Sequence, residues 1–540
     1  MTCAAEPINF AVCSPGRLSW WVFALAIVLL MGLALFFCTG VIASDDTYYL
    51  DIARHWRPGG DRSSAAPQTY ARLGMWYPIR VATWIVGDSW RALMWPPLIS
   101  AGATLVAVAV AGRRWFGDRA ALLAVIALGL TTHFLIAATI AVPDIAAAAA
   151  VAWALALAGP PLLDRGCKRA MLMAVSGGLV IGIGYVAKEP TALLVPSLGL
   201  FVLLRRPRCG WAWKRLAAVA AGAGLWLAFE AGILWHYTGN PLYHYTSVRD
   251  SHIGYGAPLT DPTFVELLDH WTQYVRWMMD PRYVFGWWGP VYLAVIAFAL
   301  WRPNDRTRIV LCTTLCLGVY LSVGSSDLGH YVPLWHQPRY LIPLMPPAAL
   351  LIGYAADWFL RRHRLLAGAT MLAGVCLAVG SMYWANQAAG RWYAARDFSA
   401  GRILLSRSDP PPSWRDRVCA SGHTAYRLSL LFEEADLGRV QAMGDPPRTA
   451  RDWMEDYGGC YLFVSGPDRR PPPPGHKRSL LTPESVEALG GFEVVARAAP
   501  PSSRGREVLS RLGILAPKSD PSDRIEVIEI PQPTAVGRDE

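Results

Sequence analysis

The sequence predicts a polytopic α-helical membrane protein with a small α/β domain at its C-terminal end. Of the 540 residues, 53% are hydrophobic and only 17% are charged, which is outside the usual range for soluble proteins. Long apolar runs recur between residues 18 and 385, and short clusters of Arg and Lys separate them. The net charge of +10 therefore reflects the positive-inside rule, and no nucleic-acid partner is expected.

About eleven membrane spans are predicted, although several are shorter than the roughly 20 residues that cross a bilayer upright. The run at 18–42 is too long for the hydrophobic region of a cleaved signal peptide, so it is the first span. With a cytoplasmic N-terminus every short inside loop is basic, and loops 43–92 and 237–285 and the C-terminal domain are external. The other spans cover residues 93–112, 120–138, 141–158, 170–187, 191–204, 216–236, 286–301, 309–324, 341–360 and 365–385.

Residues 386–540 are polar and rich in Pro and Arg, and they predict a small external α/β domain with a disordered tail. Cys419 and Cys460 lie in this domain. A disulfide between them would add about 4 kcal/mol in the chain-entropy model, but two unpaired thiols in strands fit equally well. Short β-like runs are predicted at 417–420, 440–443, 460–464, 492–495 and 525–530, with a helical stretch at 425–432.

Two adjacent carboxylates, Asp45 and Asp46, directly follow the first span, and Tyr48 and Tyr49 come next. At membrane-interface depth, this arrangement suits chemistry on a substrate that is carried by a lipid. The alternative is that the two acids only end the helix in water and the tyrosines form an aromatic belt. The amphipathic spacing of residues 48–56 and 79–86 predicts short helices that lie along the membrane surface.

Three further charged residues are expected on the same external face. Asp144 follows Pro143 at the start of a span, where an acid either favours a helix N-terminus or supplies a second carboxylate close to Asp45. Lys188 breaks the charge trend of the short loops, so it either reaches the interface or binds a phosphate. Arg339 has a planar fork that suits phosphate oxygens, or it anchors the chain at the interface beside Tyr340.

A carboxylate base beside a cationic pocket can displace a phosphate leaving group with a hydroxyl nucleophile. Charged residues in membrane proteins also mark transport pathways, so this pattern alone does not exclude a carrier. The carboxylates at 45, 46 and 144 could bind a divalent cation, but their spacing is not that of a metal-ligand motif. No other cofactor is indicated.

Several segments, in this order, resemble landmarks of the GT-C fold glycosyltransferases of the protein mannosyltransferase and aminoarabinose transferase-like superfamily. The Asp45–Arg54 segment resembles their Asp-Glu-containing first-loop motif, and Lys188-Glu-Pro190 resembles their Lys-Gly-Pro segment. The resemblance covers roughly residues 18–385. Its other landmarks are residues 112–123, 142–144, 239–241 and 338–347.

The resemblance implies an enzyme that takes a sugar from a polyprenyl-phosphate donor and transfers it, with inversion, to an acceptor on the external face. The acceptor would be a lipid, a glycan or a protein. Asp45 would be the general base, Asp144 would orient the acceptor or the sugar, and Lys188 and Arg339 would hold the phosphate. The remaining expected site residues are Asp46 as a second catalytic carboxylate and Tyr48, Tyr49, Arg54, Arg72 and Tyr340 as substrate contacts.

Two positions depart from the family pattern. Asp46 stands where the family usually has Glu, a carboxylate one methylene longer, so the resemblance supports the role of Asp45 more directly than that of Asp46. Glu189 stands where Gly is common, and it could form an ion pair with Lys188. The high content of Ala, Arg and Pro indicates a GC-rich bacterial genome, and this favours a location in a bacterial inner membrane.

Two other classes of function compete with the glycosyltransferase. One is a transporter or flippase of polyprenyl-linked saccharides, which would predict inverted repeats and charges at the bilayer midplane. The other is a membrane-anchored assembly or receptor protein, which has no need for eleven spans with carboxylates at one face. Neither inverted repeats nor charges at the bilayer midplane are evident in the sequence, so glycosyl transfer is the favoured interpretation.

Overall fold

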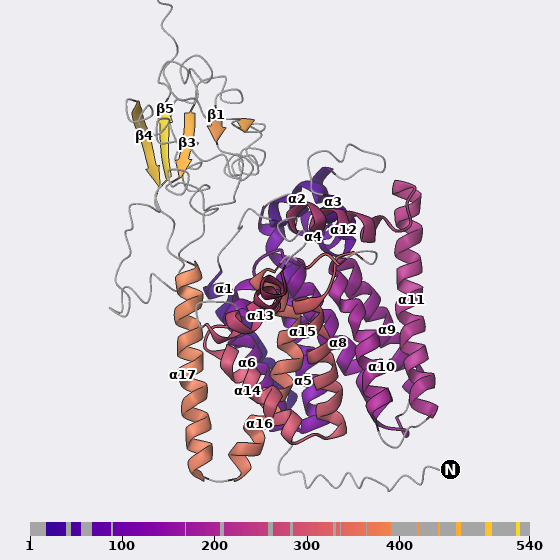
Figure 1. Cartoon of the computed structure of the whole chain (residues 1–540). Helices are drawn as coiled ribbons and strands as arrows, with labels where there is room; N and C mark the ends of the chain where they lie inside the picture. The colour runs from indigo at the N-terminus through magenta and orange to yellow at the C-terminus, as the bar shows by residue number, and fades with distance from the viewer. Residues whose placement is uncertain are drawn as a thin grey trace, which may run out of the picture. The chain divides into compact units, whose positions relative to one another are not determined.

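A computed structural model describes most of the helical region and five short strands of the C-terminal region (Figure 1). The chain forms two compact units. The first comprises Met1–Leu35, Ile52–Val81 and Trp95–Ala385, and the second comprises Phe36–Asp51, Ala82–Met94 and Asn386–Glu540. The described residues are 18–38, 45–55, 67–87, 90–167, 169–205, 210–256, 263–280, 285–327, 331–334, 336–362, 364–389, 418–420, 441–442, 461–465, 492–498 and 525–529.

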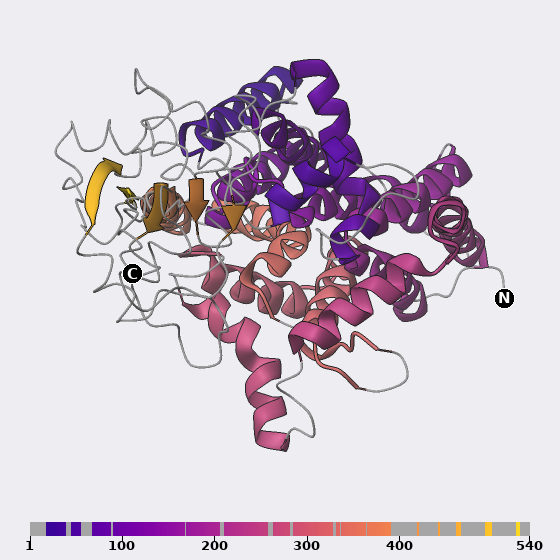
Figure 2. The same cartoon turned by 90° about the horizontal axis from the view of Figure 1, so that it is seen from above.

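Most of the described helices belong to the first unit, and many of them are seen end-on in Figure 2. The segment after α1 (Trp20–Phe36) forms short helices: α2 (Asp45–His55), α3 (Pro67–Ala71), α4 (Leu73–Val86) and η1 (Trp90–Met94). The remaining helices are α5 (Trp95–Phe116), α6 (Asp118–Gly129), α7 (Thr132–Ala137), α8 (Pro143–Leu163), α9 (Ala170–Ala187), η2 (Glu189–Leu193), α10 (Leu194–Leu204), α11 (Gly210–Thr238), α12 (Tyr243–Gly256), α13 (Phe264–Met279), α14 (Trp288–Trp301), α15 (Asp305–Val323), η4 (Pro338–Leu344), α16 (Met345–Arg362) and α17 (Arg364–Ala389).

Seven helices in the described part of the chain are long and apolar enough to cross a membrane. Three shorter apolar helices, Trp20–Phe36, Glu189–Leu204 and Trp288–Trp301, coincide with predicted spans. The predicted span at 120–138 is interrupted, because α6 ends at Gly129 and Thr131 adopts an extended conformation before α7. The structure thus supports a polytopic helical membrane protein without confirming the count of eleven spans.

Helix α17 is the most exposed of the long apolar helices. Only 6% of its apolar stretch is buried, and Leu365, Met371 and Leu372 are each more than half exposed. An apolar helix with so little protein around it needs lipid as its solvent. Figure 1 shows it at the edge of the helical unit.

Glycines allow α9 and α11 to pack closely against each other. A Cβ atom on Gly222 would overlap the carbonyl oxygen of Val175, and one on Gly178 would overlap that of Val219. Small residues at such positions let two helix backbones approach, which is the usual way that helices associate in membranes. This contact fixes the middle of α9 against α11.

We expect Gly222→Ala to lower the free energy of unfolding by about 1–3 kcal/mol, since the added methyl group overpacks the contact with α9. Gly224→Ala is the matched control on the same helix, because its Cβ would meet nothing within 4 Å. The control should be neutral or stabilising, because Ala favours a helix over Gly by about 1 kcal/mol. Unfolding of the purified protein, followed by Trp fluorescence, measures both; equal midpoints would contradict the close packing.

The second unit contains a five-stranded mixed sheet in the order β2-β1-β3-β5-β4, which can be followed in Figure 1. The strands β1 (Val418–Ala420), β2 (Gln441–Ala442) and β3 (Tyr461–Ser465) are parallel, and β4 (Glu493–Ala498) and β5 (Ile525–Glu529) add antiparallel pairings. All five strands overlap the predicted β-like runs. The predicted helix at 425–432 and Cys460 lie outside the described residues, so the disulfide stays a prediction.

Candidate functional site

Lys188 lies in the turn between α9 and η2. Pro190 has no N–H and cannot continue the hydrogen bonding of a helix, and Lys188 itself has an extended backbone with φ −159° and ψ 128°. The helix therefore ends at Ala187, and the Lys188 side chain turns into the protein, where the residue is only 3% exposed. A buried lysine needs partners that compensate its charge.

Asp144 supplies that compensation. Its Oδ1 atom accepts a hydrogen bond of 2.5 Å from Lys188 Nζ, and Arg339 Nε lies 3.8 Å from its Oδ2 atom. The Asp144 residue is 0% exposed. The Lys188 ammonium also lies 3.5 Å from the centroid of the Tyr340 ring, which is a cation–π contact. The structure thus brings together four predicted site residues from α8, the α9–η2 turn and η4.

Burial is the largest cause that lowers the pKa of Lys188 to about 8; Asp144 opposes the shift, whereas Arg72 and Arg339 add to it. The ammonium form still prevails at neutral pH. The site therefore keeps its positive charge under ordinary conditions, as binding of an anion requires.

Glu189 does not pair with Lys188 but belongs to a second cluster. Its Oε1 atom accepts hydrogen bonds of 3.2 Å from both Nε and Nη2 of Arg72. His244 Nε2 lies 3.3 Å from the same oxygen, and His244 Nδ1 lies 2.6 Å from Glu230 Oε1. Burial would lower the pKa of His244, but its hydrogen bonds to the two glutamates prevail and raise it from 6.5 to about 9.

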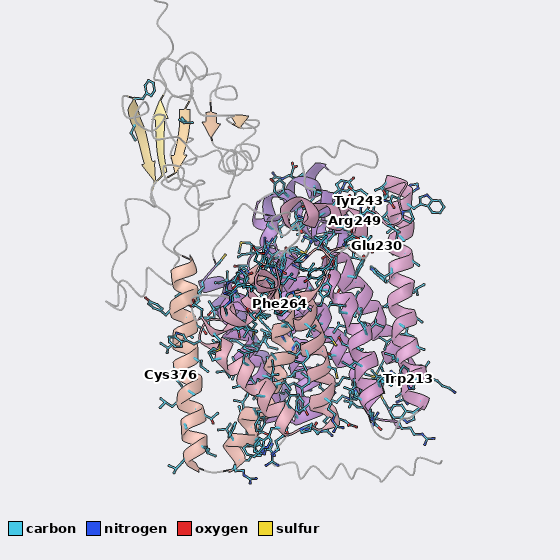
Figure 3. All side chains as sticks on the ribbon, viewed as in Figure 1. Trp213, Glu230, Tyr243, Arg249, Phe264 and Cys376 are labelled. Atoms are coloured by element: carbon cyan, nitrogen blue, oxygen red, sulfur yellow. The ribbon has the colours of Figure 1, made fainter. Side chains whose placement is uncertain are left out.

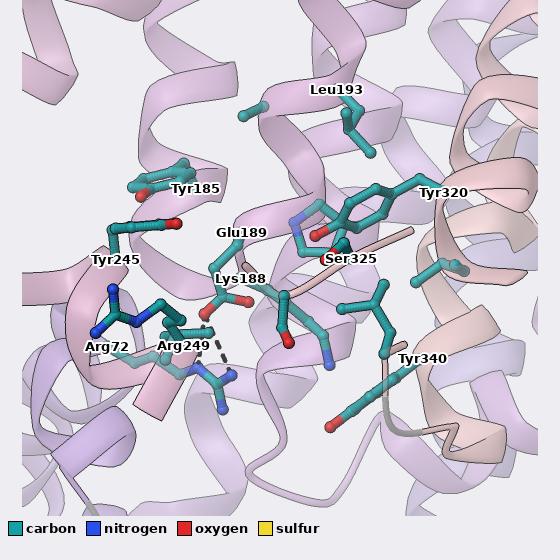
Figure 4. A pocket seen from close by; sticks show the side chains of 16 residues that line it. Arg72, Tyr185, Lys188, Glu189, Leu193, Tyr245, Arg249, Tyr320, Ser325 and Tyr340 are labelled. Atoms are coloured by element: carbon teal, nitrogen blue, oxygen red, sulfur yellow. Dashed lines mark hydrogen bonds and ion pairs between the residues drawn. The ribbon is translucent and has the colours of Figure 1, made fainter. Parts of the chain in front are cut away.

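The two clusters meet at a cavity of about 440 Å³ (Figure 4). Three cationic residues line it, namely Arg72, Lys188 and Arg249, together with Glu189. Apolar side chains such as Leu193, Val248 and Leu334 complete the wall. Four tyrosines also contribute: Tyr185, Tyr245, Tyr320 and Tyr340. An apolar cavity with a few convergent polar groups is typical of a small-molecule or cofactor site, and the excess of cations favours an anionic ligand.

The remaining predicted site residues lie on α2. Asp45 and Asp46 open this helix, but their side chains lie outside the described part of the structure. Tyr49 is buried, whereas Tyr48 and Arg54 are half-buried. The proposed roles of these residues therefore stay predictions from the sequence. No cluster of three or more His, Cys, Asp or Glu side chains that could hold a metal is found among the described residues.

Three residues of the second cluster and the cavity wall, namely Glu230, His244 and Arg249, were not among the residues predicted for the site. Glu230 lies inside a predicted span, and an ionisable residue there is a functional indicator in its own right. His244 and Arg249 belong to the predicted 237–285 loop, where a Tyr-His-Tyr segment gives no distinctive pattern. Figure 3 shows Glu230 and Arg249 toward the same end of α11, with Trp213 at the opposite end.

Comparisons with known proteins identify the architecture. The family described as dolichyl-phosphate-mannose-protein mannosyltransferase matches residues 73–235. The solved structure of ArnT from Cupriavidus metallidurans bound to undecaprenyl phosphate is 14% identical with a TM-score of 0.56; the match covers 95% of this chain and 99% of that one. The chain has the GT-C fold.

A second GT-C structure gives the same result. The oligosaccharyltransferase of Archaeoglobus fulgidus in complex with Zn and sulfate is 15% identical with a TM-score of 0.50, and the match covers 76% of this chain and 61% of that chain. No curated protein matches the sequence. The resemblance to GT-C glycosyltransferases that the sequence motifs predict is therefore confirmed.

Proposed function

We propose that this protein is a membrane glycosyltransferase that takes a sugar from a polyprenyl-phosphate-linked donor. The observation that carries the proposal is the cationic, tyrosine-lined cavity at the ends of apolar helices in a chain with the GT-C fold. A donor on a lipid phosphate stays at the membrane interface, so its phosphate needs a positively charged pocket at the end of the spans. ArnT, which shares the fold, has been solved with undecaprenyl phosphate bound.

Lys188 and Arg72 would bind the phosphate oxygens, with Arg249 and Arg339 adding positive charge nearby. Lys188 and Arg72 are nearly buried, at 3% and 4% exposed, so their attraction for an anion is little screened by water. As the sugar leaves its carrier, negative charge develops on the phosphate, and fixed cations stabilise that charge. A hydroxyl of Tyr320 or Tyr245 can donate a further hydrogen bond.

For Asp144 we propose a positioning role in place of the contact with acceptor or sugar that the resemblance implies. Its carboxylate has no exposed surface and is held by Lys188 and Arg339. We therefore assign it to positioning Lys188 within the site. A buried carboxylate that already accepts a charged hydrogen bond is a poor candidate for contact with a substrate.

Asp45 would act as the general base, as the family resemblance implies. The acceptor oxygen forms a bond to the anomeric carbon, the bond from that carbon to the phosphate oxygen breaks, and the phosphate leaves with the electron pair. The acceptor proton goes to the Asp45 carboxylate, and the single displacement inverts the anomeric centre. Tyr48, Tyr49, Arg54 and Tyr340 would contact the substrates, and the acceptor would be a lipid, glycan or protein on the external face of a bacterial inner membrane.

The test is transfer of radiolabelled sugar from a panel of polyprenyl-phosphate donors to membrane lipid and glycan extracts by the purified protein in liposomes. We expect labelled product with one class of donor and none when the donor is a free sugar. If no donor gives product while labelled lipid crosses the bilayer, the protein is a transporter and the proposal is wrong.

A further inference from the structure

His244 lies between two carboxylates, and both of its ring nitrogens face an acceptor. Its Nδ1 atom is 2.6 Å from Glu230 Oε1 and its Nε2 atom is 3.3 Å from Glu189 Oε1. An ionised carboxylate can only accept, so with both carboxylates ionised each nitrogen carries a proton and His244 is an imidazolium ion. The Tyr185 ring contacts the His244 ring at 4.7 Å between centroids.

Glu230 is the most unusual member of this group. It lies within the long apolar helix α11, eight residues and about 12 Å from the C-terminal end of that helix, and it is 4% exposed. A carboxylate at this depth is costly unless it is paired. His244 on α12 pairs with it, so the cost of burying Glu230 is offset by the charge of His244.

The arrangement leads from α11 to the cavity through a chain of contacts. His244 forms hydrogen bonds with both Glu230 and Glu189. Glu189 in turn accepts two hydrogen bonds from Arg72 at 3.2 Å. Arg72 lies between α3 and α4 and lines the cavity, whereas Glu230 and His244 do not line it. The four charges sum to zero, and Arg72 is fixed by a carboxylate that is itself fixed.

We propose that His244 and Glu230 are positioning residues that orient Glu189, and through it Arg72, for binding the phosphate of the lipid-linked donor. This inference rests on the proposed function for the identity of the ligand. Without the His244 charge, Glu189 loses its second partner and can rotate with Arg72 out of the binding geometry. A displacement of the Arg72 guanidinium by about 1 Å is enough to weaken phosphate binding or catalysis.

Undecaprenyl phosphate is the probe, and its dissociation constant is measured for the purified full-length protein in nanodiscs. We expect His244→Gln to weaken binding about tenfold, and Glu230→Gln to weaken it in the same direction. His236→Gln is the matched control, because His236 is exposed on the same helix that carries Glu230. Its affinity should equal that of the parent protein.

A double substitution separates positioning from a purely structural role. Arg72→Gln should weaken binding by itself, and adding His244→Gln to it should cause little further loss, because His244 acts through Arg72. If the two losses multiply, or if His244→Gln and Glu230→Gln fold and bind like the parent, the inference is wrong. Glu230→Gln retains the side-chain volume and serves if His244→Gln does not fold.

The outcomes also distinguish this inference from the proposed function. A parent protein that binds undecaprenyl phosphate but transfers no sugar contradicts the transfer reaction and leaves the positioning residues testable by binding. Failure of the parent to bind the probe overturns both proposals. Parent-like binding by both variants overturns only the role of His244 and Glu230.

Discussion

Replacing Lys188 with methionine is expected to abolish binding of a polyprenyl phosphate and to lower the free energy of unfolding by about 3–5 kcal/mol. Methionine keeps the apolar stem of the side chain but removes the charge. Asp144 would then keep the more distant Arg339, at 3.8 Å, in place of the hydrogen bond of 2.5 Å from Lys188. A carboxylate with no exposed surface and weakened compensation destabilises the folded state.

The double variant Asp144→Asn/Lys188→Met separates the two effects. Removing both charges eliminates the uncompensated buried carboxylate, so stability should largely recover, whereas phosphate binding should not. Lys214→Met is the control for loss of a lysine charge, since Lys214 is exposed on α11. Unfolding followed by Trp fluorescence and binding of undecaprenyl phosphate give the two readouts. Parent-like binding by the double variant would show that Lys188 is not a phosphate ligand.

Part of the site could be predicted from the sequence, because the charge pattern of the short loops is broken at Lys188. Lys188 is a cation in a short apolar loop where the charge pattern predicts none, and Pro190 predicts the turn that carries it. Asp144 and Arg339 each begin an apolar run on the same predicted face. Alternating loops place such residues at one end of the helices, and the structure brings these three into contact.

The partners of Glu189 could not be predicted in the same way. Its contact with Arg72 joins residues 117 positions apart, and no local pattern specifies which of several nearby cations a carboxylate meets. The simple expectation was the neighbouring Lys188, but adjacent side chains on an extended turn point in different directions. Glu230 did have an indicator, namely a charge inside an apolar run.

The number of spans could not be predicted reliably, because the hydropathy of a run reports its composition and not whether it forms one continuous helix. The predicted span at 120–138 is apolar throughout, yet Thr131 bonds back to Ala127 and contacts the Tyr292 hydroxyl at 3.1 Å, and the helix breaks there. A tertiary contact with α14 thus accompanies a break that the run of apolar residues does not reveal. Burial of both segments in protein keeps the interruption tolerable.

Asp45→Asn is expected to reduce kcat by about 100- to 10,000-fold, the usual contribution of a general base. Asparagine has the shape of aspartate but cannot accept the acceptor proton. Asp45 is the first residue of α2, and asparagine has the same side-chain length and shape, so the helix should form normally. Donor affinity should persist, because the proposed phosphate ligands Lys188 and Arg72 are unchanged. Single-turnover transfer of labelled sugar, together with the dissociation constant of undecaprenyl phosphate, measures both effects.

Asp46→Asn is the matched comparison, since it makes the same chemical change one residue along the same helix. Successive positions on a helix are about 100° apart, so we expect only one of the two carboxylates to act as the base. The family resemblance favours Asp45, and we therefore expect Asp46→Asn to retain more activity. A larger loss in Asp46→Asn would assign the base to Asp46, whereas parent-like kcat in both variants would place the base outside this motif and leave the Asp45-Asp46 pair as a helix terminus at the membrane surface.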